Sequence, residues 1–101
     1  NKFTFALCKS LLDGTFIVPE KEIYHAMQTL YYEDRLIAEG SCVVGIAAIL
    51  ARKLPSLKGP VATVITGRNV NMSMFTKVIN GDDISLGSQI VKGNNYQRNN
   101  L

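Results

Sequence analysis

Two short polar segments carry the side chains of this sequence that could do chemistry. Glu39-Gly40 follows a short apolar segment, and Thr66-Gly67 follows a longer apolar run. A carboxylate and a hydroxyl can orient a polar ligand, and glycine lets the backbone approach that ligand closely. The residues alone leave a simpler interpretation open, in which Glu39 and Thr66 are ordinary turn and helix-start residues.

The other candidate residues do not form a catalytic set. His25 lies between Tyr24 and Ala26 without the clustered ligands of a metal site, so we interpret it as a packing residue of a helix. Asp82-Asp83 and Glu33-Asp34 fit solvated turns. The sequence contains neither a Gly-x-x-x-x-Gly-Lys-Ser phosphate loop nor a Gly-x-Ser-x-Gly nucleophile motif. We therefore predict no metal site and no catalytic residue.

The composition fits one soluble globular unit. The 101 residues are 47% hydrophobic and 19% charged, which suffices for a core without disulfides. The net charge of +3 comes from dispersed Lys and Arg residues, unlike a nucleic-acid footprint. The longest apolar stretch, 42–51, is about half of a membrane span. Cys8 and Cys42 lack C-x-x-C spacing, so we expect buried thiols in a cytoplasmic protein, with no nucleic-acid or membrane partner.

Helices and short strands are predicted to alternate along the chain. Apolar residues at helical spacing predict helices, and short β-branched runs predict strands between them. The predicted helices are 3–12, 19–31, 41–51 and 71–80, with Asn71 or Ser73 as the last cap, and the predicted strands are 15–18, 36–38 and 61–66. This order favours an α/β fold with a parallel sheet of about three strands covered by helices. Ligands bind beyond the carboxyl ends of such strands, where Glu39 and Thr66 would lie.

The sequence divides at residue 80. Residues 1–80 are predicted to form the α/β unit, and residues 81–101 a polar, flexible tail, because 94–100 offers little apolar surface. The chain begins with Asn1 rather than Met, directly in a patterned segment. We expect it to be a piece of a longer protein.

Three segments in this order resemble one enzyme family. Residues 4–13, 32–40 and 61–70 are similar to the carboxyl-terminal part of threonine dehydratase-like enzymes. These enzymes depend on pyridoxal phosphate and have the fold type of the tryptophan synthase β-subunit, fold type II. The resemblance covers about residues 1–80, and the nearest branch is the hydroxyectoine-utilisation dehydratase. It implies that the chain is the C-terminal part of the large catalytic domain.

The resemblance also implies roles for individual residues. The residue matching Thr66 offers its hydroxyl to the pyridine nitrogen of the cofactor, with Gly67 beside it and the carboxylate matching Glu39 near the same end of the ring. A neutral hydroxyl, unlike an aspartate, does not hold that nitrogen protonated. This suits β-elimination, which converts a hydroxy amino acid substrate to a 2-oxo acid and ammonia. Arg68 and Asn71 depart from the Gly-Gly-Asn-Val-Asp pattern usual in the family.

The resemblance further implies that this chain alone is inert. In the family, the Schiff-base lysine, within a Ser-x-Lys-x-Arg-Gly type motif, and the glycine-rich phosphate loop lie upstream, and neither motif occurs here. We therefore expect no bound cofactor in the isolated chain.

Two alternatives belong to other functional classes. The chain could be a free-standing α/β interaction module that binds a partner through an edge strand or an apolar helix face. It could also be a small effector-binding domain, although the alternating strand pairs and helices of such domains are not predicted. Helix faces without cover leave apolar surface in water, so we expect a homo-oligomer.

Overall fold

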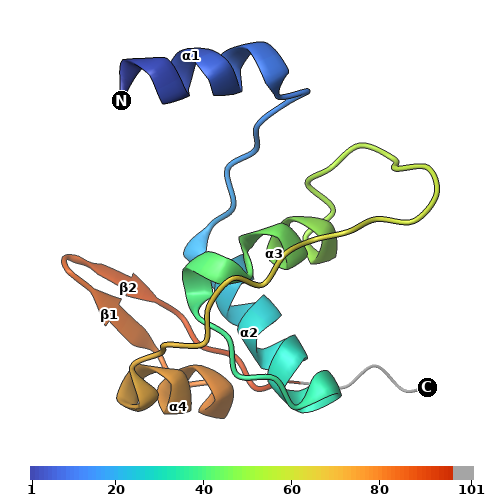
Figure 1. The fold of residues 1–101 in the computed structure, drawn as a ribbon. Helices are drawn as coiled ribbons and strands as arrows, with labels where there is room; N and C mark the ends of the chain where they lie inside the picture. The colour runs from blue at the N-terminus through green and yellow to red at the C-terminus, as the bar shows by residue number, and fades with distance from the viewer. Residues whose placement is uncertain (97–101) are drawn as a thin grey trace.

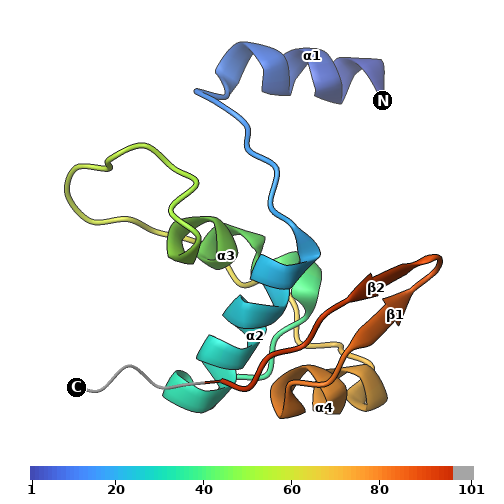
Figure 2. The same ribbon diagram turned by 180° about the vertical axis from the view of Figure 1, so that it is seen from behind.

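The computed structural model describes residues 1–96, and helices dominate this part of the chain (Figures 1 and 2). The helices are α1 (Lys2–Leu11), α2 (Glu20–Asp34), the short 3-10 helix η1 (Gly40–Cys42), α3 (Val44–Leu50) and α4 (Met72–Asn80). An antiparallel hairpin of β1 (Ile84–Leu86) and β2 (Gln89–Val91) follows. The fold is therefore mixed, with several helices and one small two-stranded sheet.

Helix α2 is the centre of the molecule, with α3 on one side and α4 on the other (Figure 1). Pro19 precedes its first turn, where Glu20 and Glu22 lie at the positive end of the helix dipole. Arg35, with a φ of 58°, ends it in the left-handed conformation. The sequence predicts this helix and its start because the start signals and the apolar stripe are local, whereas the helix continues three residues past the predicted end at 31, to Asp34.

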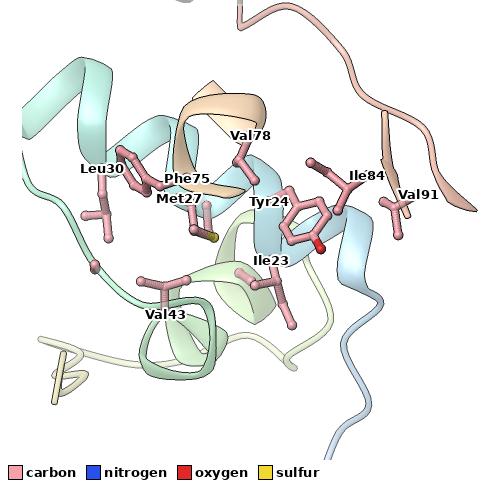
Figure 3. Close-up of a cluster of buried hydrophobic side chains, with 12 residues drawn as sticks. Ile23, Tyr24, Met27, Leu30, Val43, Phe75, Val78, Ile84 and Val91 are labelled. Atoms are coloured by element: carbon pink, nitrogen blue, oxygen red, sulfur yellow. The ribbon is translucent and has the colours of Figure 1, made fainter. Parts of the chain in front are cut away.

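The core lies between α2 and the elements around it (Figure 3). Phe75 of α4 and Val43 beside η1 are the largest fully buried side chains. The Phe75 ring meets the Tyr31 ring of α2 edge to face, with 5.6 Å between centroids. The other labelled members of the core are Ile23, Tyr24, Met27, Leu30, Val78, Ile84 and Val91.

Helix α4 has the boundaries that its sequence predicts. Of the two candidate caps, Asn71 is the one used, because its Oδ1 accepts a hydrogen bond from the Met74 N–H at 3.1 Å. Gly81 ends the helix with a φ of 79°.

The structure of residues 1–96 does not show the predicted parallel sheet, and its one sheet is the two-stranded antiparallel hairpin. Segments 15–18, 36–38 and 61–66 contain no strand, although their backbone is free of helix as expected. Val64 is 75% exposed and Val61 is 51% exposed, so much of the apolar run 61–66 has no cover in the described chain. A buried parallel strand needs hydrogen-bonded neighbours and two covered faces, and these segments find neither among residues 1–96.

The segment after Gly81 is more ordered than its composition predicts. Ile84 pairs with Val91 across the hairpin, and both side chains are 5% exposed within the core. Three-residue strands need little apolar surface when α4 lies beside them. Gln28 Nε2 also donates to the Asn94 carbonyl at 3.0 Å, which ties the chain after β2 to α2. The flexible-tail prediction is therefore wrong for 84–91, while residues 97–101 lie outside the described residues and the division at residue 80 stays a prediction.

Asp83 holds the base of the hairpin. Its Oδ1 accepts the Gly93 N–H at 2.9 Å, and its Oδ2 lies 3.3 Å from Lys92 Nζ. The Gly93 hydrogen bond, followed by the Lys92 hydrogen bond and charge, lowers the pKa of the Asp83 carboxyl. Asp83 thus joins the two ends of the hairpin rather than lying in a merely solvated turn.

Helix α1 forms as predicted but lies apart from the other elements (Figures 1 and 2). Asn1 caps it, accepting the Thr4 N–H at 2.8 Å. None of its residues is buried, and Phe3 is 77% exposed. Within residues 1–96, no helix has the length and apolar character needed to cross a membrane.

Candidate cofactor-contact site

The two polar segments singled out in the sequence lie side by side. The Glu39 backbone N–H donates a hydrogen bond to the Gly67 carbonyl at 3.2 Å. This one bond joins the chain after 36–38 to the chain after 61–66, where a sheet would have placed a ladder of such bonds. The structure therefore brings Glu39, Thr66 and Gly67 together, and their role in binding stays a prediction.

The Cys42 thiol lies between the two segments. Thr66 Oγ1 donates to Cys42 Sγ at 3.0 Å, and Cys42 Sγ donates to Glu39 Oε2 at 3.8 Å. The Ser41 hydroxyl also lies 3.8 Å from the same sulfur. Hydrogen bonds that involve sulfur are longer than those between oxygen atoms. These contacts therefore form a continuous polar chain from the Thr66 hydroxyl through the Cys42 thiol to the Glu39 carboxylate.

Local backbone geometry places Glu39 and Cys42 on one side. The Cys42 N–H donates to the Glu39 carbonyl at 2.9 Å, which closes the turn of η1. In a 3-10 turn, residues three positions apart eclipse one another. Ala38 and Val43, 1% and 0% exposed, anchor the two ends of this turn in the core. The segment that carries Glu39 and Cys42 is therefore fixed by packing against α2.

Gly67 permits the segment that carries Thr66 to lie close to Glu39 and Cys42. A Cβ atom at this position would lie 2.8 Å from Glu39 Oε2 and 3.2 Å from Cys42 Sγ. Gly45 of α3 makes a similar approach, because a Cβ there would overlap the Thr63 hydroxyl. The absence of a side chain at Gly45 and Gly67 therefore lets the irregular segment 61–67 lie close to η1 and α3.

The site is open on one side. Glu39, Cys42 and Gly67 are half-buried, whereas Thr66 is exposed. A neighbouring cavity of about 150 Å³ is bounded by Glu39, Gly40, Met27, Asn69, Val70, Asn71, Met74 and Phe75. Ligand pockets usually enclose roughly 300–1,000 Å³, so these residues can contact one edge of a ligand rather than surround it.

The remaining sequence candidates lie elsewhere. His25 is half-buried, with its ring 6.3 Å from the Tyr96 ring, which fits its interpretation as a packing residue. Among residues 1–96, no cluster of three His, Cys, Asp or Glu side chains could hold a metal ion. Arg68 is exposed beside Gly67, and nothing in the structure explains its choice.

Sequence reasoning missed Cys42. The residue was interpreted as a buried thiol, but it is half-buried, and Cys8 on α1 is exposed. The available signal was that Cys42 follows Glu39 by three positions, with Gly40 between them as a residue that can start a tight turn. That signal is weak, because the same spacing occurs by chance in any chain.

Known proteins similar to this chain carry one consistent set of names. A protein of Sinorhizobium fredii with the provisional name threonine dehydratase is 41% identical over 80% of this chain and 24% of its own length. The L-threonine ammonia-lyase of Thermotoga maritima is 36% identical, over 86% of this chain and 21% of the enzyme. The serine racemase of Dictyostelium discoideum is 34% identical over 79% of this chain and 25% of the racemase. The relatives of this chain are thus threonine dehydratases, L-threonine ammonia-lyases and serine racemases.

The similarity covers most of this chain but a small part of each relative. The chain spans about a quarter of the length of the curated relatives it matches. No family model matches it, and no solved structure does. The names of these relatives confirm the resemblance to threonine dehydratase-like enzymes over most of this chain. The hydroxyectoine branch and the place of the chain within the enzyme stay predictions.

Proposed function

We propose that this chain is part of a pyridoxal phosphate-dependent ammonia-lyase of the threonine dehydratase type, in which Glu39, Thr66 and Gly67 contact one edge of the cofactor ring. The observation that carries the proposal is the hydrogen bond between Glu39 N–H and the Gly67 carbonyl, which brings a carboxylate and a hydroxyl to one place. The names of the relatives support the enzyme class.

The residues present fit the ring edge of the cofactor. The Thr66 hydroxyl is exposed, so it can bond to a ligand without further movement of the chain. Gly67 has no Cβ, so its backbone lies close to Glu39 and Cys42 and keeps the neighbouring Thr66 beside them. When bound, pyridoxal phosphate serves as an electron sink that eases loss of the Cα proton and of the β-hydroxyl. The residues of this chain orient that ring and set its electrostatic surroundings.

The proposed substrate is a hydroxy amino acid, with a 2-oxo acid and ammonia as products. Relatives are named for threonine or serine, and both are β-hydroxy amino acids. The finer parts of the proposal are a place near the hydroxyectoine-utilisation branch, a carboxyl-terminal position in the catalytic domain, a cytoplasmic homo-oligomer, and a parallel sheet that segments 15–18, 36–38 and 61–66 complete with strands from the rest of the enzyme.

The test uses the full-length protein with Thr66→Val, which removes the hydroxyl at nearly constant volume. We expect the variant to bind cofactor, seen by its visible absorbance, while turnover of threonine and serine falls about 10- to 100-fold, the size expected for a lost hydrogen bond to a charged or polarised group. Thr76→Val on the exposed side of α4 is the matched control and should keep its activity. Unchanged turnover in Thr66→Val would refute the assigned role.

A self-associating interaction module is the second candidate. The apolar side chains that α1 exposes, such as Phe3 and Leu11, favour it because they need a cover. The absence of cofactor absorbance and of ammonia release in the full-length protein would select this alternative.

A further inference from the structure

We propose that Gln28 is a positioning residue of the cofactor-contact site. It joins α2 and α4 to residues 92–96, which we call the strap, and through α4 it holds Thr66 and Gly67 against Glu39. This inference rests on the proposed function and deepens it, because it names a side chain outside the site on which the contact between the two site segments depends.

Gln28 is the buried polar side chain of the core that residues 1–96 form, and it is 2% exposed. Its Nε2 atom donates one hydrogen bond to the Val78 carbonyl of α4 at 2.7 Å and a second to the Asn94 carbonyl of the strap at 3.0 Å. An amide nitrogen carries two protons, so both are used. One side chain of α2 therefore joins two segments that lie 50 and 66 positions further along the chain.

Two side chains of α2 bind the last turn of α4. The first is Gln28, and in the second bond the Tyr32 hydroxyl donates to the Ile79 carbonyl at 2.7 Å. The last four carbonyls of a helix lack the N–H donors of a following turn, so side chains can bind them. Gln28 and Tyr32 are four positions apart and lie on the same face of α2. The end of α4 is therefore held at two points along α2.

The chain after β2 crosses α2 (Figure 2), and the strap lies directly against the end of α4. A Cβ atom at Gly93 would overlap the carbonyls of Gly81 and Asp82. A Cβ atom at Gly81 would lie 2.7 Å from the Asn94 carbonyl oxygen. With no side chain between these two segments, the Asn94 carbonyl comes within reach of Gln28. Gln28 thus lies where α2, α4 and the strap meet.

Helix α4 begins next to the cofactor-contact site. Its cap, Asn71, follows Gly67 by four positions. Met74 and Phe75 of α4 border the same small cavity as Glu39. Because the nine residues of α4 form one continuous helix, a shift of its end also moves its start. Loss of the bonds at the end of α4 therefore weakens the contact of Gly67 with Glu39.

Stability alone does not explain an amide at position 28. Gln28 Oε1 is buried and has no hydrogen-bond partner among residues 1–96. An unpaired buried acceptor costs free energy, which a methionine of similar shape would avoid. Without Gln28, the Val78 carbonyl would keep the Gly81 N–H at 3.1 Å, and the exposed Asn94 could bond to water. The amide therefore contributes to the placement of α4 and the strap more than to stability.

The experiment uses full-length protein with Gln28→Met and follows the backbone amide of Glu39. That amide donates to the Gly67 carbonyl, so its hydrogen exchange reports the contact between the two site segments. In the cofactor-free protein we expect its exchange to become about fivefold faster, the effect of one ordinary hydrogen bond, and the dissociation constant for pyridoxal phosphate to rise by a similar factor. Mass spectrometry of the exchanged peptides and fluorescence titration give the two values.

Two references separate positioning from a general loosening of the fold. The Ala47 amide, which donates to the Val43 carbonyl at the start of α3, should exchange at an unchanged rate in the same sample. Thr29→Val is the matched control on α2. Its hydroxyl donates to the His25 carbonyl of the same helix at 2.8 Å, so its removal should change neither the exchange nor the cofactor affinity.

Tyr32→Phe removes the other side-chain bond to the end of α4 but keeps the ring, so it should also speed exchange at Glu39, and it serves in place of Gln28→Met if that variant does not fold. Faster exchange at Glu39 with unchanged cofactor affinity would uphold the role of Gln28 and overturn the proposed cofactor contact. Unchanged exchange at Glu39, or an equal rise at Ala47, would overturn the role of Gln28. A loss of turnover in Thr66→Val would still support the proposed function in that case.

Discussion

Gly67 lies where any side chain would meet two functional groups. The atoms a Cβ would approach, Glu39 Oε2 and Cys42 Sγ, are both ends of side chains rather than backbone. The carboxylate can therefore move away at little cost to the fold. A substitution at Gly67 should disturb the site more than the stability of the chain.

We predict that Gly67→Ala weakens cofactor binding by the full-length protein about tenfold, because it displaces Glu39 and narrows the approach to the ring. Fluorescence titration with pyridoxal phosphate measures the affinity, and thermal unfolding should differ by only a few degrees. Gly14→Ala is the matched control, since a Cβ there meets Phe16 at an ordinary 3.7 Å. Equal affinities for the two variants would contradict the proposed contact.

At the residue scale, the sequence predicted Glu39, Thr66 and Gly67 as one site and could not predict what connects them. Glycine beside a polar residue is visible in any sequence. The Cys42 thiol contacts Thr66 across 24 positions of sequence, and only the folded chain shows that contact.

At the scale of elements, the hairpin is the clearest addition to the expected fold. Ile84 and Val91 face the core, whereas Ile90 on the same hairpin is 63% exposed. The alternation puts apolar residues of one strand on different faces. Ile84 and Ile90 should therefore contribute differently to stability although both are isoleucine.

We predict that Ile84→Ala lowers the free energy of unfolding by about 2–4 kcal/mol, because it leaves a cavity in the core. Ile90→Ala should change it by less than about 0.5 kcal/mol, as for most exposed positions. Urea unfolding of the 101-residue chain, followed by circular dichroism, gives both values. Similar effects for the two variants would show that the hairpin does not pack as described.

The helices could be predicted and the strands could not, for a physical reason. The predicted limits of these helices depend on Pro19 at the start of α2 and on Asn71 and Gly81 at the two ends of α4, which all act within one turn of the helix. The end of α2 at Asp34, capped by Arg35, was not predicted. A strand depends on a neighbour that lies far away in the sequence. Segment 61–66 has strong β propensity and no such neighbour among residues 1–96, so it is irregular.

At the scale of the whole molecule, α1 is the element without a partner. Phe3, Leu7 and Leu11 recur at four-residue spacing, which aligns them on one helical face, and they are 77%, 47% and 71% exposed. A contiguous apolar face in water is usually covered by another surface. In the proposed enzyme, the rest of the protein supplies that cover.

We predict that the 101-residue chain alone associates into dimers or larger species through α1, measured by light scattering across a concentration series. The combined substitutions Phe3→Ser, Leu7→Ser and Leu11→Ser should shift the chain toward the monomer, because they remove the apolar face. Ile90→Ser, at an exposed position of the hairpin, is the control and should leave the association unchanged. A monomer at every concentration would contradict the prediction.

The most direct test of the whole account is the accessibility of Cys42 in the full-length protein. Brief alkylation with iodoacetamide, followed by mass spectrometry, gives the rate at Cys42 with and without saturating pyridoxal phosphate, and the rate at Cys8 in the same sample serves as the reference. If Glu39, Cys42 and Thr66 line the edge of the bound ring, the cofactor slows alkylation of Cys42 several-fold and leaves Cys8 unaffected. An unchanged rate at Cys42, with the cofactor demonstrably bound, would contradict the account.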